Sequence, residues 1–172
     1  GERGAELARE LGDAACFRRA DVAKADDVQA LVEETVQRFG ALHIMFNNAG
    51  ISGAQHPRFL DDDLSDFHRV IDVNLYSVLL GSRCAGKYMA RHGGGVIINN
   101  ASIAGILPGQ ALVSYRASKA AVIHLSKCIA IDLAEDVRQP QPAPHRVGGG
   151  RNIGSGIERV EQRAQRLVEI EI

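Results

Sequence analysis

Long apolar runs are missing from this 172-residue sequence, and no stretch approaches the length that is needed to cross a bilayer. An excess of charge is also missing, because 20 lysines and arginines nearly balance 21 aspartates and glutamates. These absences argue against a membrane-spanning protein, and against nucleic acid or an anionic membrane as the main partner. The hydrophobic content of 45% is that of a single globular domain that can bury a core.

Cysteine is scarce as well, and the three cysteines, Cys16, Cys84 and Cys128, lie far apart. The sequence contains no Cys-x-x-Cys and no cluster of cysteine and histidine with the spacing of a zinc site. We therefore expect reduced thiols in a cytoplasmic protein, and no metal site. The first residues have neither an initiator methionine nor signal-peptide character, so we expect the chain to begin inside a longer protein.

Helices and short apolar strands alternate along most of the chain. Helices are predicted at residues 4–11, 26–40 (with Asp26 as the capping residue), 64–92 and 114–135, and strands at residues 14–19, 42–46 and 96–100. This alternation predicts an α/β fold with a doubly wound parallel sheet and helices on both faces. Ligands of such sheets bind beyond the carboxyl ends of the strands. Asp21, Asn47 to Gly50 and Ser102 all follow predicted strands, so we expect them to line one crevice.

Tyr115 and Lys119 are four residues apart, and a helix would bring both side chains to one face. An ammonium beside a phenol favours the phenolate, and so lowers the tyrosine pKa from its ordinary value of about 10. Such a pair can transfer a proton near neutral pH. Asn74 lies inside a predicted long helix, where asparagine is a poor helix former and would locally open the hydrogen-bond ladder.

Four motifs together resemble the classical short-chain dehydrogenase/reductase family, in the family's order and at about its spacing. They are Asn47-Asn48-Ala49-Gly50, Asn74, Ser102 and the Tyr115/Lys119 pair. The resemblance covers roughly residues 1 to 137 and implies an incomplete Rossmann-like fold. It also implies an enzyme, an oxidoreductase that transfers a hydride between NAD or NADP and an alcohol or ketone.

The resemblance implies catalytic roles for four residues. Tyr115 would be the acid/base, and Lys119 would lower its pKa and bind the nicotinamide ribose. Ser102 would hydrogen-bond the substrate oxygen, and Asn74 would hold a water that passes protons from Lys119 to solvent. Ser102 could also be an ordinary turn serine.

The resemblance implies cofactor contacts as well. Asp21 and Val22 would contact adenine, although Asp21 could instead cap a helix. Asn48, Ala49 and Gly50 would let the adenosine half of the dinucleotide approach the backbone. An asparagine of this motif could also tie neighbouring strands together.

The resemblance breaks at both ends of the chain. Gly1 lies in the helix after the family's second strand, so the glycine-rich phosphate turn and the residue that separates NAD from NADP are missing. From Gln139 alternate prolines predict an extended linker, and residues 157–172 could form a marginal helix. We therefore divide the chain into a partial catalytic core at residues 1–137 and an atypical tail at residues 138–172. The tail could be a frameshift or a truncation. It could also be a permuted segment, because Gly150, Gly154 and Gly156 have the spacing of the missing turn.

Three functions remain open on this basis. The favoured one is hydride transfer to or from a small-molecule alcohol or carbonyl compound, in a protein that forms dimers or tetramers when complete. The same Tyr/Lys pair could serve a sugar-nucleotide epimerase or dehydratase. The chain could also be a truncated, catalytically impaired fragment that only associates with partners. The substrate and the direction of reaction are not readable from the sequence.

Overall fold

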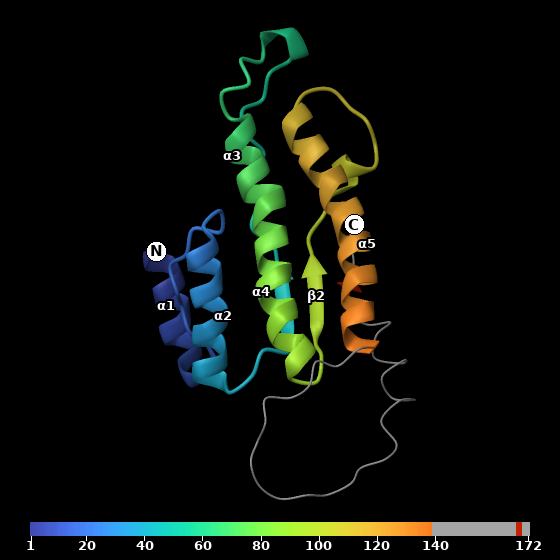
Figure 1. Cartoon of the computed structure of the whole chain (residues 1–172). Coiled ribbons are helices and arrows are strands. Elements are labelled where there is room, and N and C mark those ends of the chain that lie inside the picture. The colour runs from blue at the N-terminus through green and yellow to red at the C-terminus, as the bar shows by residue number, and fades with distance from the viewer. Residues whose placement is uncertain (139–167, 170–172) are drawn as a thin grey trace, which may run out of the picture.

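The structure is a computed structural model that describes residues 1–138 and 168–169 (Figure 1). In chain order its elements are α1 (Glu2–Leu11), a 3-10 turn (Gly12–Ala14), α2 (Ala25–Phe39), β1 (Ile44–Asn47), a 3-10 turn (Phe59–Asp61), α3 (Phe67–Ile71), a π-helical turn (Asp72–Tyr76), α4 (Ser77–Arg91), β2 (Val96–Asn99), a 3-10 turn (Ile103–Gly105), α5 (Val113–Arg138) and β3 (Val168–Glu169). The predicted proline-rich linker and the glycine spacing at 150–156 lie outside the described residues.

The strands form one parallel sheet in the order β1-β2-β3. Asn47 at the end of β1 lies opposite Asn99 at the end of β2. The incomplete parallel α/β fold is therefore confirmed. The predicted helix over residues 157–172 is wrong at Val168–Glu169, because the free edge of β2 offers backbone hydrogen-bond partners to an extended segment there.

The helices cover one face of this sheet. Along β1 the side chains alternate, with Ile44 61% and Phe46 51% exposed, whereas Met45 is partly buried and Asn47 is buried. Figure 1 shows α4 beside the sheet, with α2 on one flank and α5 on the other. Helices on both faces were expected, but among residues 1–138 and 168–169 none covers the face that carries Ile44 and Phe46.

Two sequence predictions near the N-terminus are wrong. Residues 14–19 were expected to form a strand, but the chain there makes the end of a 3-10 turn and then a segment without regular secondary structure, which pairs with no strand among the described residues. A strand needs a hydrogen-bonded neighbour, and the apolar pattern alone does not supply one. Asp26 does not cap α2, because Lys24 occupies the N-cap position and makes no side-chain capping hydrogen bond. Asp26 lies in the first turn, where its negative charge stabilises the helix by interacting with the positive end of the helix dipole.

The predicted helix at residues 64–92 is interrupted. It begins only at Phe67, because Leu64 adopts a positive φ of 58°. The π-helical turn then separates α3 from α4 and contains Asn74. The local opening of the ladder that was expected at Asn74 is therefore present. In the described part of the chain, no helix combines the length and the apolar character that a membrane crossing requires.

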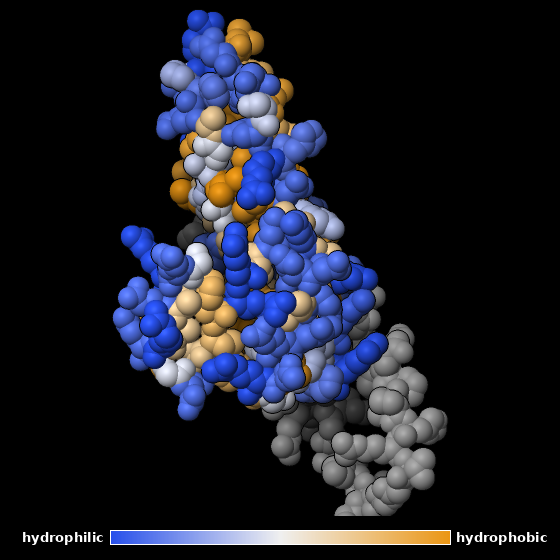
Figure 2. Space-filling view, turned by 90° about the vertical axis from the view of Figure 1, so that its left-hand side faces the viewer, coloured by the Kyte–Doolittle hydropathy of each residue, from blue (hydrophilic) through white to orange (hydrophobic). Residues whose placement is uncertain are grey.

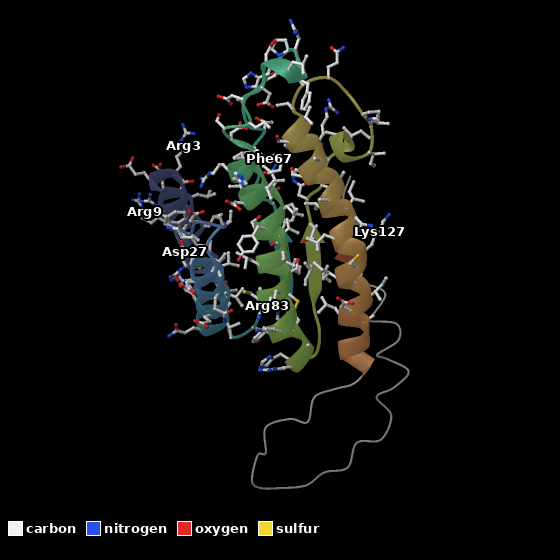
Figure 3. All side chains as sticks on the ribbon, turned by 45° about the horizontal axis from the view of Figure 1, so that its top comes forward. Arg3, Arg9, Asp27, Phe67, Arg83 and Lys127 are labelled. Carbon is white, nitrogen blue, oxygen red and sulfur yellow. The ribbon has the colours of Figure 1, made fainter. Side chains whose placement is uncertain are left out.

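Apolar side chains of α2, α4, β1 and β2 form the main core. Its buried members include Val28, Val32, Leu80, Cys84, Ala85, Met89 and Ile97. Burial raises the pKa of the Cys84 thiol, which suits a packing role. Figure 3 shows Arg3 and Arg9 projecting outwards from α1 and Lys127 outwards from α5, so these charges stay in solvent. Figure 2 shows the α1–α2 side, where a largely hydrophilic surface surrounds smaller apolar areas.

A buried polar network crosses the covered face of the sheet. The Asn47 side-chain amide donates to Asn99 Oδ1 at 2.8 Å and to Ser82 Oγ at 3.3 Å. Asn99 in turn donates to Ser126 Oγ at 2.9 Å. The network therefore joins β1 and β2 to α4 and α5, and it confirms that an asparagine of the first motif ties neighbouring strands together.

We expect Gly81→Ala to lower the free energy of unfolding by about 1–3 kcal/mol, because overpacked buried sites cost that much. A Cβ at Gly81 would overlap Asn47 Oδ1 and would lie 2.8 Å from Met45 Cε, so it would disturb the amide network. Urea unfolding followed by circular dichroism measures the change. The matched control in α4 is Gly86→Ala, whose Cβ would meet only the Leu133 side chain, at 3.1 Å. Equal stability of the two variants would contradict this account of Gly81.

Candidate active site

The candidate site lies where the loops after β1 and β2 meet the first turns of α5. A pocket of about 410 Å³ is lined there by Asn48, Gly50, Ile51, Ser52, Asn100, Ala101, Leu112, Tyr115 and Lys119. The structure thus brings together four of the predicted site residues, Asn48, Gly50, Tyr115 and Lys119. They come from the loop after β1 and from α5, which are distant in sequence but meet at the carboxyl end of the parallel sheet.

The Lys119 ammonium is buried beside Tyr115. The lysine is 5% exposed, and its Nζ lies 5.8 Å from the centroid of the Tyr115 ring. Nζ donates a hydrogen bond to the Asn100 carbonyl oxygen at 2.8 Å. Burial lowers the pKa of Lys119 from its usual value, because removal from water penalises the charged form. A cation in such surroundings acts on nearby groups more strongly than it would in water.

Asn74 is fully buried and connects the loop after β1 to α5. Its Oδ1 accepts from the Ile51 backbone N–H, and its Nδ2 donates to the Ile51 carbonyl, both at 2.8 Å. Nδ2 also donates to Ser118 Oγ at 3.0 Å. The side-chain amide therefore positions two walls of the pocket, and the proton-relaying water at Asn74 stays a prediction.

Ser118 lies outside the pocket lining, but it supports the candidate site and was missed by the sequence analysis. It is fully buried, accepts from Asn74 and donates to the Tyr115 carbonyl oxygen at 2.7 Å. Helical serines commonly donate to a carbonyl three or four residues earlier. The position of Ser118, three residues after Tyr115 and one before Lys119, was therefore a usable signal.

Two glycines lie beside the lysine, and at one of them a side chain would not fit. A Cβ at Gly50 would lie 3.6 Å from Lys119 Nζ, so this glycine borders the ammonium directly. A Cβ at Gly105 would lie 2.7 Å from the Lys119 carbonyl carbon and 2.8 Å from the Ala120 nitrogen. The loop after β2 therefore rests on the backbone of α5 at Lys119, and a side chain at Gly105 would push the two apart.

Ser102 does not line the pocket. Its hydroxyl accepts the Ala104 N–H at 3.2 Å and caps the 3-10 turn Ile103–Gly105. This contact is the one that an ordinary turn serine makes. The role of Ser102 toward a substrate oxygen stays a prediction.

Asp21 and Val22 also lie outside the pocket lining. The Asp21 carboxylate accepts the Ala23 N–H at 3.1 Å, and the Asp21 N–H donates to the Asp27 carboxylate at 2.8 Å. Because the segment before Asp21 is not a strand, this aspartate does not follow a strand end as expected. Ala49 is exposed, and the neighbouring Asn48 accepts from the Asn100 side chain at 2.6 Å.

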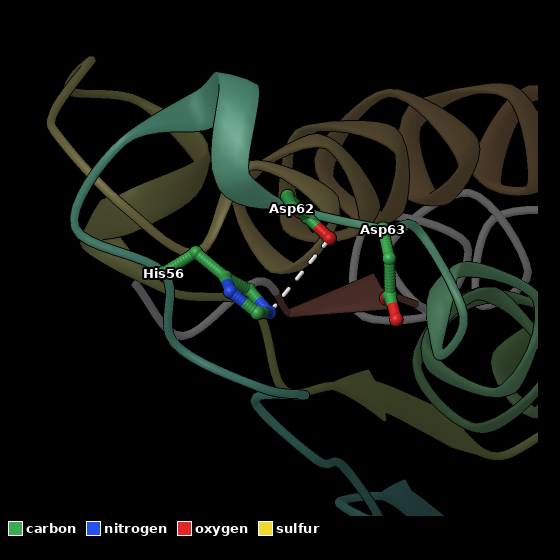
Figure 4. A group of neighbouring side chains, drawn as sticks. All are labelled: His56, Asp62 and Asp63. Atoms are coloured by element: carbon green, nitrogen blue, oxygen red, sulfur yellow. Dashed lines mark ion pairs between the residues drawn. The ribbon is translucent and has the colours of Figure 1, made fainter.

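His56, Asp62 and Asp63 form a cluster whose ligand-type atoms lie within 4.8 Å of one another (Figure 4). His56 Nε2 is 3.9 Å from Asp62 Oδ1. The carboxylates also accept turn amides, from Leu64 to Asp62 at 2.8 Å and from Ser65 to Asp63 at 2.9 Å. Hydrogen bonds from Ser65 lower the pKa of Asp63. The ion pair and the turn contacts account for the cluster, and we assign no metal to it.

The depressed pKa of Lys119 predicts a pH dependence of stability. Between the folded pKa and the ordinary value of 10.5, the unfolded chain binds more protons than the folded chain. We therefore expect the stability of the wild type, measured relative to Lys119→Met, to rise as the pH increases towards 10.5 and to fall as the pH drops through the folded pKa. Urea unfolding from pH 7 to pH 10 measures this difference. Lys127→Met, at an exposed position on the same helix, is the control for the removal of a lysine charge. A flat profile for Lys119→Met would contradict the burial of a charged lysine.

The chain matches known proteins over most of its length. Residues 1–146 match the family described as short chain dehydrogenase. The chain is 40% identical over 161 residues to 3beta-hydroxysteroid dehydrogenase 2 of Eggerthella lenta, covering 92% of this chain and 60% of that relative. It is 38% identical over 135 residues to (+)-borneol dehydrogenase 2 of Salvia officinalis, covering 77% and 48% of the two chains.

Solved structures show the same likeness. A short chain dehydrogenase from Mycobacterium smegmatis has a TM-score of 0.69 and 36% identity, over 78% of this chain and 57% of its own. NAD+-bound xylitol dehydrogenase has a TM-score of 0.65 and 33% identity, over 68% and 45% of the two chains. The chain thus spans about half the length of the proteins that it matches. Because the family match covers residues 1–146, most of the chain, this chain belongs to the short chain dehydrogenase family.

Proposed function

We propose that this chain forms the catalytic part of an NAD- or NADP-dependent oxidoreductase that interconverts an alcohol and a ketone, with Tyr115 as the acid/base. The observation that carries the proposal is the buried Lys119 ammonium, which lies beside the Tyr115 ring at a pocket formed by the loops after β1 and β2. An ordinary surface lysine keeps its charge in water. The Lys119 ammonium instead lies at the wall of the pocket and is hydrogen-bonded to the Asn100 carbonyl oxygen.

The proposed proton transfer runs through Tyr115. When an alcohol is oxidised, its hydroxyl proton passes to the Tyr115 oxygen while its carbon gives up a hydride; reduction reverses both transfers. A bound nicotinamide supplies or accepts that hydride. The Lys119 ammonium lies beside this tyrosine, and Ser102 is proposed to orient the substrate oxygen.

The pocket suits the nicotinamide end of such a cofactor. Gly50, which the family resemblance assigned to the adenosine half, lies beside Lys119 Nζ, so we propose instead that a ribose hydroxyl of the nicotinamide end reaches the ammonium there. The neighbour solved with NAD+ supports a nicotinamide cofactor, and both NAD and NADP stay candidates. Asp21, Val22 and Ala49 are proposed for the adenosine half, whose site is less complete, since none of the three lines the pocket.

We further propose an uncharged alicyclic alcohol or ketone as the substrate. Ile51, Ala101 and Leu112 give the pocket an apolar wall. Two relatives are named for a hydroxysteroid and for borneol, which are both alicyclic alcohols.

The proposed location is the cytoplasm, supported by three cysteines that are all free. Association into dimers or tetramers is proposed through α4 and α5, where Leu79 and Ile131 are 41% and 64% exposed.

One observation favours the alternative of a catalytically impaired fragment. The sheet face with Ile44 and Phe46 is uncovered by the described residues, and the proposed adenine contacts lie apart from the pocket. Apolar side chains of a parallel sheet are normally covered on both faces. In this alternative the chain keeps the proton-transfer pair but binds cofactor weakly, and it acts only by associating with partners.

We expect Tyr115→Phe to lower kcat by about 10²–10⁴-fold, which is the usual contribution of a positioned acid/base. Oxidation of borneol with NAD+ and NADP+, followed by absorbance of the reduced cofactor, measures the effect. Tyr88→Phe is the control, because Tyr88 stacks on His92 away from the pocket and should leave kcat unchanged. An active Tyr115→Phe enzyme would remove Tyr115 from the mechanism.

We expect the 172-residue chain to bind reduced cofactor only weakly, because the adenosine half has few contacts in the described structure. Titration with NADH and NADPH, followed by cofactor fluorescence, measures the affinity. Gly50→Val separates specific from non-specific binding, since its side chain would fill the space beside Lys119. Tight binding that Gly50→Val abolishes would contradict the fragment alternative, whereas weak binding that Gly50→Val leaves unchanged would contradict our assignment of the nicotinamide pocket.

A further inference from the structure

Arg116 joins the start of α5 to the loop that precedes it. Its Nη1 donates to the Leu107 carbonyl oxygen at 3.1 Å, and its Nε donates to the Ala111 carbonyl oxygen at 3.3 Å. Gly109 lies against the guanidinium, because a Cβ there would be 2.5 Å from Nη2 and 2.7 Å from Cζ. One side chain therefore contacts the beginning, the middle and the end of the loop at residues 107–112.

This loop needs such a contact because its backbone is unfavourable at its end. Ala111 and Leu112 have φ values of 56° and 51°, in the left-handed region that side chains with a Cβ rarely adopt. Two such residues in succession persist only where surrounding contacts hold them. The guanidinium supplies a planar set of donors that can bind two carbonyls at once, which a lysine ammonium on its flexible stem matches poorly.

Leu112 is the residue that this loop delivers to the pocket. It lines the 410 Å³ pocket with Tyr115 and Lys119, and it also lines a second cavity of about 300 Å³. The other residues around the second cavity are His56, Pro57, Phe59, Asp62, Gly109, Gln110, Ala111 and Val113. Leu112 is therefore the wall that the two cavities share.

We propose that Arg116 is a positioning residue that fixes Leu112 between the two cavities and thereby limits the size of the substrate. The catalytic part of this inference rests on the proposed function. With the loop held, a small alicyclic alcohol occupies the pocket beside Tyr115. With the loop released, Leu112 no longer separates the cavities, and a longer polycyclic alcohol extends into the space bordered by His56 and Phe59.

The first experiment measures the loop itself and needs no turnover. The chain has no tryptophan, so Leu107→Trp, at a position that is 57% exposed, introduces a single fluorescent reporter. We expect its anisotropy to fall when Arg116→Ala or Gly109→Ala is added, because the first removes the guanidinium and the second displaces it. Arg116→Lys should give a smaller loss. Arg91→Ala, at an exposed position in α4, is the matched control and should give none.

The second experiment compares cyclohexanol with epiandrosterone, a 3β-hydroxysteroid. We expect Arg116→Ala and Leu112→Ala each to raise the ratio of kcat/KM for the steroid over cyclohexanol by about tenfold, mainly through the steroid KM, since a pocket wall is worth that much in selectivity. The double variant should give no further increase, because both changes remove the same wall. Arg116→Lys should restore part of the wild-type ratio.

The outcomes separate this inference from the proposed function. Unchanged anisotropy in Arg116→Ala, with the fold intact by circular dichroism, overturns the positioning role. Lower anisotropy with equal losses of kcat for both alcohols overturns the size limit. If neither alcohol is oxidised by the wild type, the proposed function fails. The size limit is then decided by steroid binding, read as quenching of the Leu107→Trp emission: tighter binding in Arg116→Ala supports it, and unchanged binding overturns it.

Discussion

The hydrogen bond between the buried amides of Asn47 and Asn99 is the interaction on which the rest of the structure depends. Each amide has further partners, Ser82 in α4 and Ser126 in α5, so one buried contact fixes two strands and two helices together. Loss of one partner would leave buried polar groups unsatisfied, which costs more than a typical hydrogen bond contributes. The absence of a side chain at Gly81 is what allows α4 to approach this network.

The position of the candidate catalytic lysine follows from the same contact. The Asn100 N–H donates to the Asn47 carbonyl oxygen at 3.1 Å, directly after the paired asparagines. The carbonyl of Asn100 then accepts from Lys119 Nζ. The strand ends therefore hold the ammonium, while Asn74 and Ser118 hold the helix that carries it. A site built this way is rigid because its parts belong to the core.

Local patterns predicted the local parts of this protein. The strands β1 and β2, the helices α2 and α5, and the shared face of Tyr115 and Lys119 follow from apolar periodicity and from spacing within one helix. Features that need a distant partner were not predictable. The expected strand at residues 14–19 lacks a neighbour, and β3 exists because β2 offers an edge.

In the candidate site, too, some contacts were predictable from local patterns and others were not. The strand-end pattern predicted one crevice lined by Asp21, Asn47 to Gly50 and Ser102, and of these Asn48 and Gly50 line the pocket. The helical spacing predicted separately that Tyr115 and Lys119 share one face. The sequence could not reveal that Gly105 rests on the α5 backbone, or that Arg116 reaches back to the loop before it. Contacts of this kind depend on the path of an irregular loop, which has no periodicity to read.

The alternating burial of side chains along β1 affects the register in which β1 pairs with β2. The covered face of β1 carries Met45 and Asn47, while Ile44 and Phe46 lie on the open face, so a one-residue slip would turn two apolar side chains towards α4 in exchange for one. The slip would turn the Asn47 amide outwards and break its hydrogen bonds to Asn99 and Ser82. The polar contacts of Asn47 therefore favour the observed register of β1, whereas burial of Ile44 and Phe46 would favour the slipped one.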